Sequence, residues 1–171
     1  MLALDDIQHI LLARAPALAA RYEFLSFRNP SAGQAWLTGI LPTVQSAAEA
    51  RARVAEDRRW VTVGFTWNGL QALGVDTASL GTFPEEFKQG MVSRAEILGD
   101  TGANQPDHWV GGLASPNLHA IAILFARDRA ERERCQSEHR ELVARCEGVE
   151  VLSSLDLDAT PPFDYAHDHF G

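Results

Sequence analysis

The six histidines are the residues of this chain best suited to bind a metal or to move a proton. Two of them, His167 and His169, are two residues apart, with Asp164 and Asp168 close by. In an extended segment this spacing places both imidazoles on one side, which is a pattern for a weak metal site. The segment is otherwise polar and follows two prolines, so we interpret it as a linker and expect no metal site.

Another histidine, His119, stands at the start of an apolar run and is expected to pack at the end of a strand. The four tryptophans are a second group with possible chemistry, because indoles can relay electrons in oxidative enzymes. Packing in the core or at an interface is the ordinary role of such large side chains, and we favour it here. The tryptophans are Trp36, Trp60, Trp67 and Trp109.

The two cysteines, Cys135 and Cys146, fall on one predicted helix. Eleven residues of helix separate them by about 16 Å, which is too far for a disulfide. We therefore expect reduced thiols and a cytoplasmic protein.

Motifs that would identify a common catalytic site are absent from the sequence. There is no glycine-rich phosphate loop, no Gly-x-Ser-x-Gly and no His-Glu-x-x-His. The net charge of −8 argues against nucleic acid and anionic membranes as partners. No apolar run approaches the roughly 20 residues that span a membrane, and the first 20 residues do not resemble a secretory signal.

Four segments have the composition of β-strands, at 22–27, 61–66, 119–125 and 149–152. The segment 119–125 is apolar on both alternating faces, which predicts a central strand covered on both sides. Replacing a large side chain there should cost about 2–5 kcal/mol.

Helical patterns lie between these strands. Asn29-Pro30-Ser31 precedes an apolar stripe over 32–41, and a capping box predicts a helix over 47–59. A third helix is expected from Asp128 to Cys146. This order predicts an α+β fold of the ferredoxin-like type. It would have a four-stranded antiparallel sheet, helices on one face, and a helical and loop insertion between the second and third strands, at about 67–117.

The insertion carries the most distinctive residues of the chain. It reads FPEEFKQGM from Phe83, RAEILGDTG from Arg94 and PDHW from Pro106. We expect its apolar side chains to dock onto the domain and to order much of the loop. These side chains are Phe83, Phe87, Met91, Leu98 and Trp109.

These motifs resemble the N-terminal half of the dye-decolourising (DyP-type) haem peroxidases. Matching segments flank them, at Asp6-Ile7-Gln8, at Thr66 to Leu70, and at the terminal His169-Phe170-Gly171. His9 departs from the resemblance, since the family often has glycine there. The resemblance implies two ferredoxin-like domains, with haem b between the sheet and the helices of the second.

The family's distal acid belongs to a Gly-x-x-Asp-Gly motif, of which Gly171 matches the first glycine. The resemblance therefore carries only Phe170 and Gly171 to the neighbourhood of the cofactor. The acid, the axial histidine and the distal arginine would all fall after residue 171, so no catalytic residue is expected in this chain. The implied division is a domain over 1–155 and a linker over 156–171, leading to a C-terminal haem-binding half.

Three interpretations of function remain open at this point. The chain is a scaffold half of a haem peroxidase, which uses hydrogen peroxide and an organic reductant and is inactive without its haem-binding half. Alternatively, it is a free-standing ferredoxin-like module for binding or assembly. As a third possibility, it binds haem itself. In the first case we expect no haem on this chain alone, and an uncovered apolar surface that favours self-association or pairing.

Overall fold

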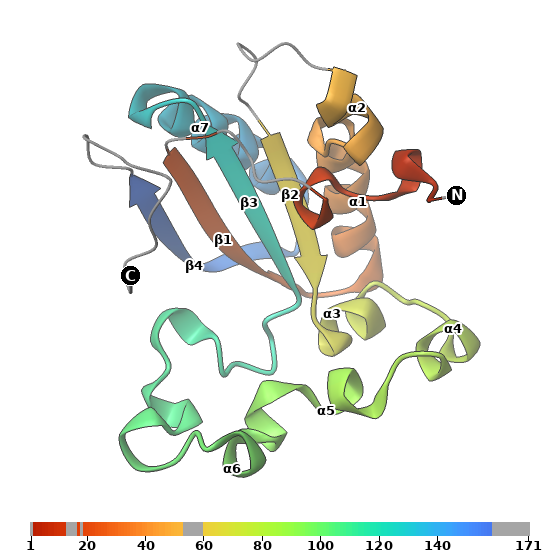
Figure 1. Ribbon diagram of the computed structural model, residues 1–171, viewed down its shortest axis with the longest axis vertical. Coiled ribbons are helices and arrows are strands. Elements are labelled where there is room, and N and C mark those ends of the chain that lie inside the picture. Colours follow the sequence, from red (N-terminus) through yellow and green to blue (C-terminus); the bar gives the residue numbers. More distant parts are fainter. Residues whose placement is uncertain (1, 13–16, 18, 53–59, 159–171) are drawn as a thin grey trace.

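A computed structural model describes residues 2–12, 17, 19–52 and 60–158. Its centre is one antiparallel sheet of four strands in the order β2-β3-β1-β4 (Figure 1). The strands are β1 (Ala19–Phe27), β2 (Trp60–Phe65), β3 (Ala120–Ala126) and β4 (Val149–Asp158). This order and the helices on one face confirm the ferredoxin-like α+β prediction.

The strand predicted to be central is central, because β3 pairs with β1 on one side and with β2 on the other. Its two faces differ, however. Ala120, Ala122 and Leu124 are buried under the helices, whereas Ile121 and Ile123 on the opposite face stay partly exposed. The expectation of cover on both faces is therefore only half met within the described residues.

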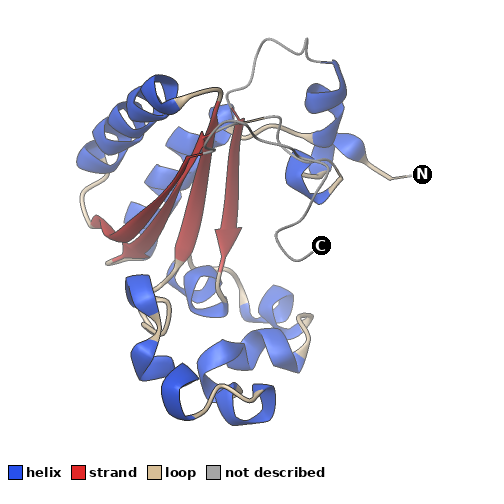
Figure 2. Cartoon of the chain, turned by 60° about the vertical axis from the view of Figure 1, so that its left-hand side comes forward, coloured by secondary structure: helices blue, strands red, loops and turns tan. Residues whose placement is uncertain are grey.

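Two helices cover the buried face, α1 (Pro30–Ile40) and α7 (Arg129–Arg145) (Figure 2). Helix α7 begins directly after Asp128 as predicted, and α1 begins at Pro30, two residues before the predicted start at 32. The Asn29 side chain accepts a hydrogen bond from the Ala32 amide at 2.9 Å, and Asp128 accepts one from the Glu131 amide at 2.8 Å. These caps satisfy amides that the first helical turn leaves without partners.

Short helices occupy the edge beside β2. They are η1 (Leu4–Asp6), η2 (His9–Leu11), η3 (Leu41–Thr43) and α2 (Ala47–Ala52). The predicted capping box is present, since the Ser46 amide donates to Glu49 at 2.8 Å. The predicted continuation of α2 over residues 53–59 lies outside the described residues.

The insertion between β2 and β3 forms a separate layer at one end of the sheet (Figure 1). It contains α3 (Trp67–Ala72), α4 (Thr77–Gly81), α5 (Glu85–Ser93) and α6 (Ala95–Leu98), followed by η4 (Gly102–Asn104), η5 (Pro106–His108) and η6 (Val110–Gly112). Gly69 of α3 lies so close to the start of β3 that a Cβ there would stand 1.8 Å from the His119 carbonyl oxygen. A residue without a side chain is therefore needed to seat α3 on the sheet.

The docking prediction for the insertion is partly wrong. The rings of Phe83 and Phe87 do pack on Trp67, each with a centroid separation of 6.3 Å. Met91 and Leu98 instead remain 58% and 46% exposed. Gly90, with φ of 70°, interrupts α5 between Phe87, which packs on Trp67, and Met91, which is largely exposed.

At the C-terminal end, β4 continues to Asp158, three residues into the segment that we expected to be linker. The rest of that segment, 159–171, lies outside the described residues. Among the helices of the described chain, none is long and apolar enough to cross a membrane.

Candidate functional site

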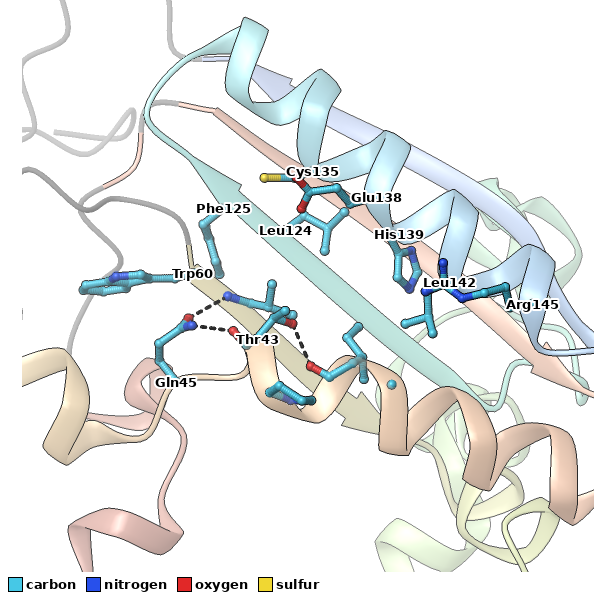
Figure 3. Close-up of a pocket in the computed structure, with 14 residues that line it drawn as sticks. Thr43, Gln45, Trp60, Leu124, Phe125, Cys135, Glu138, His139, Leu142 and Arg145 are labelled. Atoms are coloured by element: carbon cyan, nitrogen blue, oxygen red, sulfur yellow. Dashed lines mark hydrogen bonds between the residues drawn. The ribbon is translucent and has the colours of Figure 1, made fainter.

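A cleft of about 440 Å³ separates α1 from α7 above the sheet (Figure 3). The two helices approach closely at one end, where a Cβ on Gly39 would stand 2.3 Å from a Leu142 methyl carbon. They diverge toward Thr43 and Cys135, and β2 and β3 form the floor. The lack of a side chain at Gly39 brings the helices together there, so the cleft opens at the other end.

The polar groups on the β2 side of this cleft are mostly used by the fold itself. The Gln45 side-chain oxygen accepts from the Val61 amide at 2.9 Å, and its amide donates to the Thr43 carbonyl. Thr43 in turn donates its hydroxyl to the Ile40 carbonyl at 2.7 Å. These bonds tie η3 to β2 and fix the shape of the cleft.

A chain of buried hydrogen bonds begins on the α7 side of the cleft. Trp36 donates its indole N–H to Nε2 of His139 at 2.9 Å. On the other side of the ring, Nδ1 of His139 lies 2.5 Å from a carboxylate oxygen of Glu23. Trp36 is fully buried, and His139 and Glu23 are each only 4% exposed. An indole can only donate, so Nε2 is the accepting nitrogen and the proton of neutral His139 is on Nδ1.

Glu23 is held in its charged form by two partners. Burial by itself would raise the pKa of this carboxyl, but the hydrogen bonds from His139 and Arg21 outweigh it and leave the pKa below its ordinary value. The Arg21 Nε donates to the second carboxylate oxygen at 2.6 Å. A buried carboxylate with a donor on each oxygen is a stable acceptor at neutral pH.

The network continues from Arg21 to the edge of the sheet. Arg21 contacts Asp156 at 2.7 Å, and Arg132 of α7 pairs with both Asp156 and Asp158. Arg132 is only 4% exposed. The acidic side chains of Asp156 and Asp158 thus hold α7 against the sheet edge.

A second hollow lies in the insertion and is mainly apolar. It is a groove of about 1010 Å³ between α3, α5 and the loop that leads to β3. Its apolar lining includes Trp67, Phe87, Met91, Trp109 and Leu113. Such a groove can accommodate apolar side chains or a ligand.

The third feature is the sheet face turned away from α1 and α7. Strand pairing places Tyr22 beside Ile123 and Leu155, and Phe24 beside Ile121, all on this face. Leu155 and Leu157 are 53% and 46% exposed. Within the described residues, helices approach this face at two places. His9 of η2 packs on Trp60 with ring centroids 4.4 Å apart, and η6 lies against β4, where Ser153 donates its hydroxyl to the Gly111 carbonyl. The remainder is a contiguous apolar surface of the kind that contacts a partner.

The residues singled out in the sequence have different outcomes. Phe170, Gly171, His167 and His169 lie outside the described residues and stay predictions. His119 stands at the strand end as predicted, where its Nδ1 accepts from the Phe27 amide at 2.8 Å, and burial lowers its pKa. No cluster of three or more potential metal ligands occurs in the part of the chain that the structure describes.

Sequence patterns did not reveal the buried network. Glu23 sits in an aromatic-rich strand and Arg132 in a highly charged helix, where each resembles a solvent-exposed residue. One available signal was His139, which shares the narrow apolar side of its helix with the two cysteines. The alternation of β1 also places Arg21 and Glu23 on the same face as Leu25 and Phe27, and that alternation would have predicted their burial.

Comparison with known proteins identifies the family. The family model described as the DyP dimeric alpha+beta barrel domain matches residues 6–154. The chain belongs to the DyP peroxidase family. It corresponds to the N-terminal domain of that family, as the motifs of the insertion predicted.

Individual DyP relatives are distant in sequence but close in fold. Peroxidase 2 of Mycetinis scorodonius is 28% identical over 173 residues, which cover 99% of this chain and 32% of the relative. A dye-decolorizing peroxidase of Mycena epipterygia is 22% identical over 171 residues, or 31% of its length. The chain therefore spans about a third of the curated relatives it matches.

Solved DyP structures show the same fold. One described as the crystal structure of DyP superposes with a TM-score of 0.82 at 20% identity, covering 100% of this chain and 36% of that one. A fungal DyP-type peroxidase from Auricularia auricula-judae gives 0.80 at 21% identity, covering 99% and 36%.

Haem is the cofactor that the DyP family implies, and the described histidines differ in how the fold engages their ring nitrogens. An axial ligand needs an imidazole nitrogen free to face the iron. Both nitrogens of His139 are engaged by Trp36 and Glu23, His119 accepts from Phe27, and His9 is enclosed by aromatic rings. His108 is exposed, with Nδ1 3.1 Å from a backbone carbonyl. His139 therefore offers iron no ligand without breaking a contact of the fold, whereas at His119 and His108 the hydrogen bonds engage Nδ1 alone.

Proposed function

We propose that this chain is the scaffold half of a DyP-type haem-dependent peroxidase, which oxidises dyes or other organic compounds with hydrogen peroxide. The haem and the groups that activate peroxide would belong to a separate C-terminal haem-binding half. The observation that carries the proposal is the apolar sheet face opposite α1 and α7. On that face Leu155 and Leu157 are exposed, and the neighbouring apolar side chains of β1 and β3 are partly exposed.

Two findings support this assignment. The matched family is described as a dimeric alpha+beta barrel, and such a barrel forms when two sheets pack face to face. The chain also spans only 32% of Peroxidase 2, so most of that relative has no counterpart here. A second sheet would bury Tyr22, Ile123 and Leu155 and remove their contact with water.

In this proposal the residues of the chain orient the interface and do not react with peroxide. The Trp36–His139–Glu23 chain and the Arg132 pairs hold α1, α7 and β4 in fixed positions beneath the interface. Haem, when bound to the partner half, would supply the redox chemistry. This chain would contribute a rigid surface and exclude water from one side of the interface between the two halves.

The test is to mix the purified chain with a separately produced DyP haem-binding domain. Size-exclusion chromatography, the Soret absorbance and dye oxidation are then measured for each component and for the mixture. We expect a one-to-one complex that carries haem and has activity absent from this chain alone. Saturable one-to-one haemin binding by the chain alone, with dye turnover well above that of free haemin, would overturn the proposal.

A pair of variants tests the surface itself. Ile123→Asp places a charge at the centre of the apolar face and should abolish the complex. Arg129→Asp lies on the outer side of α7, where the Arg129 side chain is 74% exposed, and should leave the complex intact. Equal binding by both variants would mean that the sheet face is not the interface. Failure of the unaltered chain to bind at all would favour the free-standing module.

A further inference from the structure

The hydrogen-bond chain beneath α7 has a chemical asymmetry that a packing role does not require. Trp36 donates its only N–H to an unprotonated imidazole nitrogen, 2.9 Å away. The opposite nitrogen of that imidazole faces the Glu23 carboxylate, and Arg21 holds the second oxygen of that carboxylate. A carboxylate in this position fixes the tautomer of a histidine and stabilises its protonated form. The indole proton therefore faces a base that is prepared to receive it.

The other tryptophans lack this arrangement. Trp109 donates to the backbone carbonyl of Asn104 at 2.9 Å, and a carbonyl oxygen is far too weak a base to take the proton. The Trp60 nitrogen meets no hydrogen-bond partner among the described residues. Trp67 packs against the rings of Phe83 and Phe87. Of the indoles in the described chain, Trp36 is the one that donates to a side-chain base.

We propose that Trp36, His139 and Glu23 form a proton-coupled redox site. A one-electron oxidant removes an electron from the Trp36 indole, and the Nε1 proton moves to Nε2 of His139. The products are a neutral indolyl radical and an imidazolium paired with the Glu23 carboxylate. Reduction returns the electron to the indole and the proton to its nitrogen, so charge and atoms balance in both directions.

Burial determines how long such a radical would survive. Trp36 has no exposed surface, so water and dioxygen do not reach the ring directly. The proton is kept within the site, because His139 is 4% exposed and both of its nitrogens are in contact with protein partners. The site would therefore store one oxidising equivalent reversibly. The proposal rests on the peroxidase assignment only for the natural source of the oxidant.

The experiment supplies its own oxidant, so its result is independent of that assignment. A ruthenium polypyridyl photosensitiser is attached at Ala35→Cys, an exposed position of α1 next to Trp36. The native cysteines are each 7% exposed, which directs labelling to the new thiol. Flash oxidation is followed by transient absorption and by electron paramagnetic resonance after rapid freezing. We expect a neutral tryptophan radical, formed more slowly in deuterated water.

Matched variants assign the signal to the three residues. Trp36→Phe should abolish the neutral-radical signal, and Trp109→Phe should leave it unchanged. His139→Gln removes the base and should convert the signal to the protonated radical cation. If that variant does not fold, Glu23→Gln is expected to shift the same balance toward the cation in a folded protein. A radical unaffected by Trp36→Phe, or a persistent cation in the unaltered site, would overturn the proposal.

Discussion

Replacing Glu23 by glutamine tests the buried network with almost no change in shape. Glutamine offers one oxygen and one NH₂ group where the carboxylate offers two acceptors. One of the two donors, from Arg21 or His139, must then face another donor in a site that is 4% exposed. Charge-assisted hydrogen bonds contribute about 1.5–3 kcal/mol each, and breaking a buried pair costs about 3–5 kcal/mol. We expect the free energy of unfolding to fall by about 2–4 kcal/mol at pH 7.

The pH dependence gives the same prediction a second test. The folded-state pKa of Glu23 is lower than its unfolded value. Its stabilising contribution is therefore fully present above the unfolded pKa, and it is lost as the pH falls through the folded pKa. The stability difference between the unaltered chain and Glu23→Gln should thus be largest at neutral pH and should shrink in acid.

Urea denaturation monitored by circular dichroism at several pH values measures both effects. Glu133→Gln is the matched control. Glu133 lies on the exposed side of α7, where its carboxylate is 3.1 Å from Nε of Arg129. That surface pair should contribute no more than about 0.5 kcal/mol. If Glu23→Gln lowers the free energy of unfolding no more than Glu133→Gln does at pH 7, the buried network does not stabilise the fold as described. The same conclusion follows if the loss caused by Glu23→Gln does not change with pH.

Three further predictions concern the fold and its surface. Gly69→Ala should lower the free energy of unfolding by about 1–3 kcal/mol or more in thermal melts, because the new Cβ would clash with the backbone of His119. Gly81→Ala is the control, since its Cβ would meet nothing within 4 Å, and it should be neutral or stabilising. Asn29→Ala removes the cap of α1 and should cost about 1 kcal/mol by urea denaturation, and a loss no larger than the experimental error would contradict the capping role. Leu155→Ser combined with Leu157→Ser should reduce self-association of the chain in analytical ultracentrifugation, and an unchanged sedimentation profile would show that this face does not associate.

Much of the fold followed from local patterns. The caps at Asn29 and Asp128 and the alternation in 119–125 depend on residues near one another in sequence, so they can be recognised directly. Those patterns predicted the four strands, the two covering helices and the position of the insertion. The motifs of the insertion, from FPEEFKQGM to PDHW, together with the matching segments that flank them, indicated the DyP family.

The candidate site was decided by tertiary structure. Trp36 and His139 are 103 residues apart, and His139 and Glu23 are 116 apart, so no local pattern links them. The kink in α5 likewise depends on the backbone conformation of Gly90, because a glycine in the sequence is compatible with a continuous helix and with a kink. Amino-acid type alone makes Glu23 and Arg132 appear to be surface residues. The sheet register and the packing of α7 bury both residues. In the folded protein Glu23 is paired with Arg21 and His139, and Arg132 is paired with two aspartates of β4.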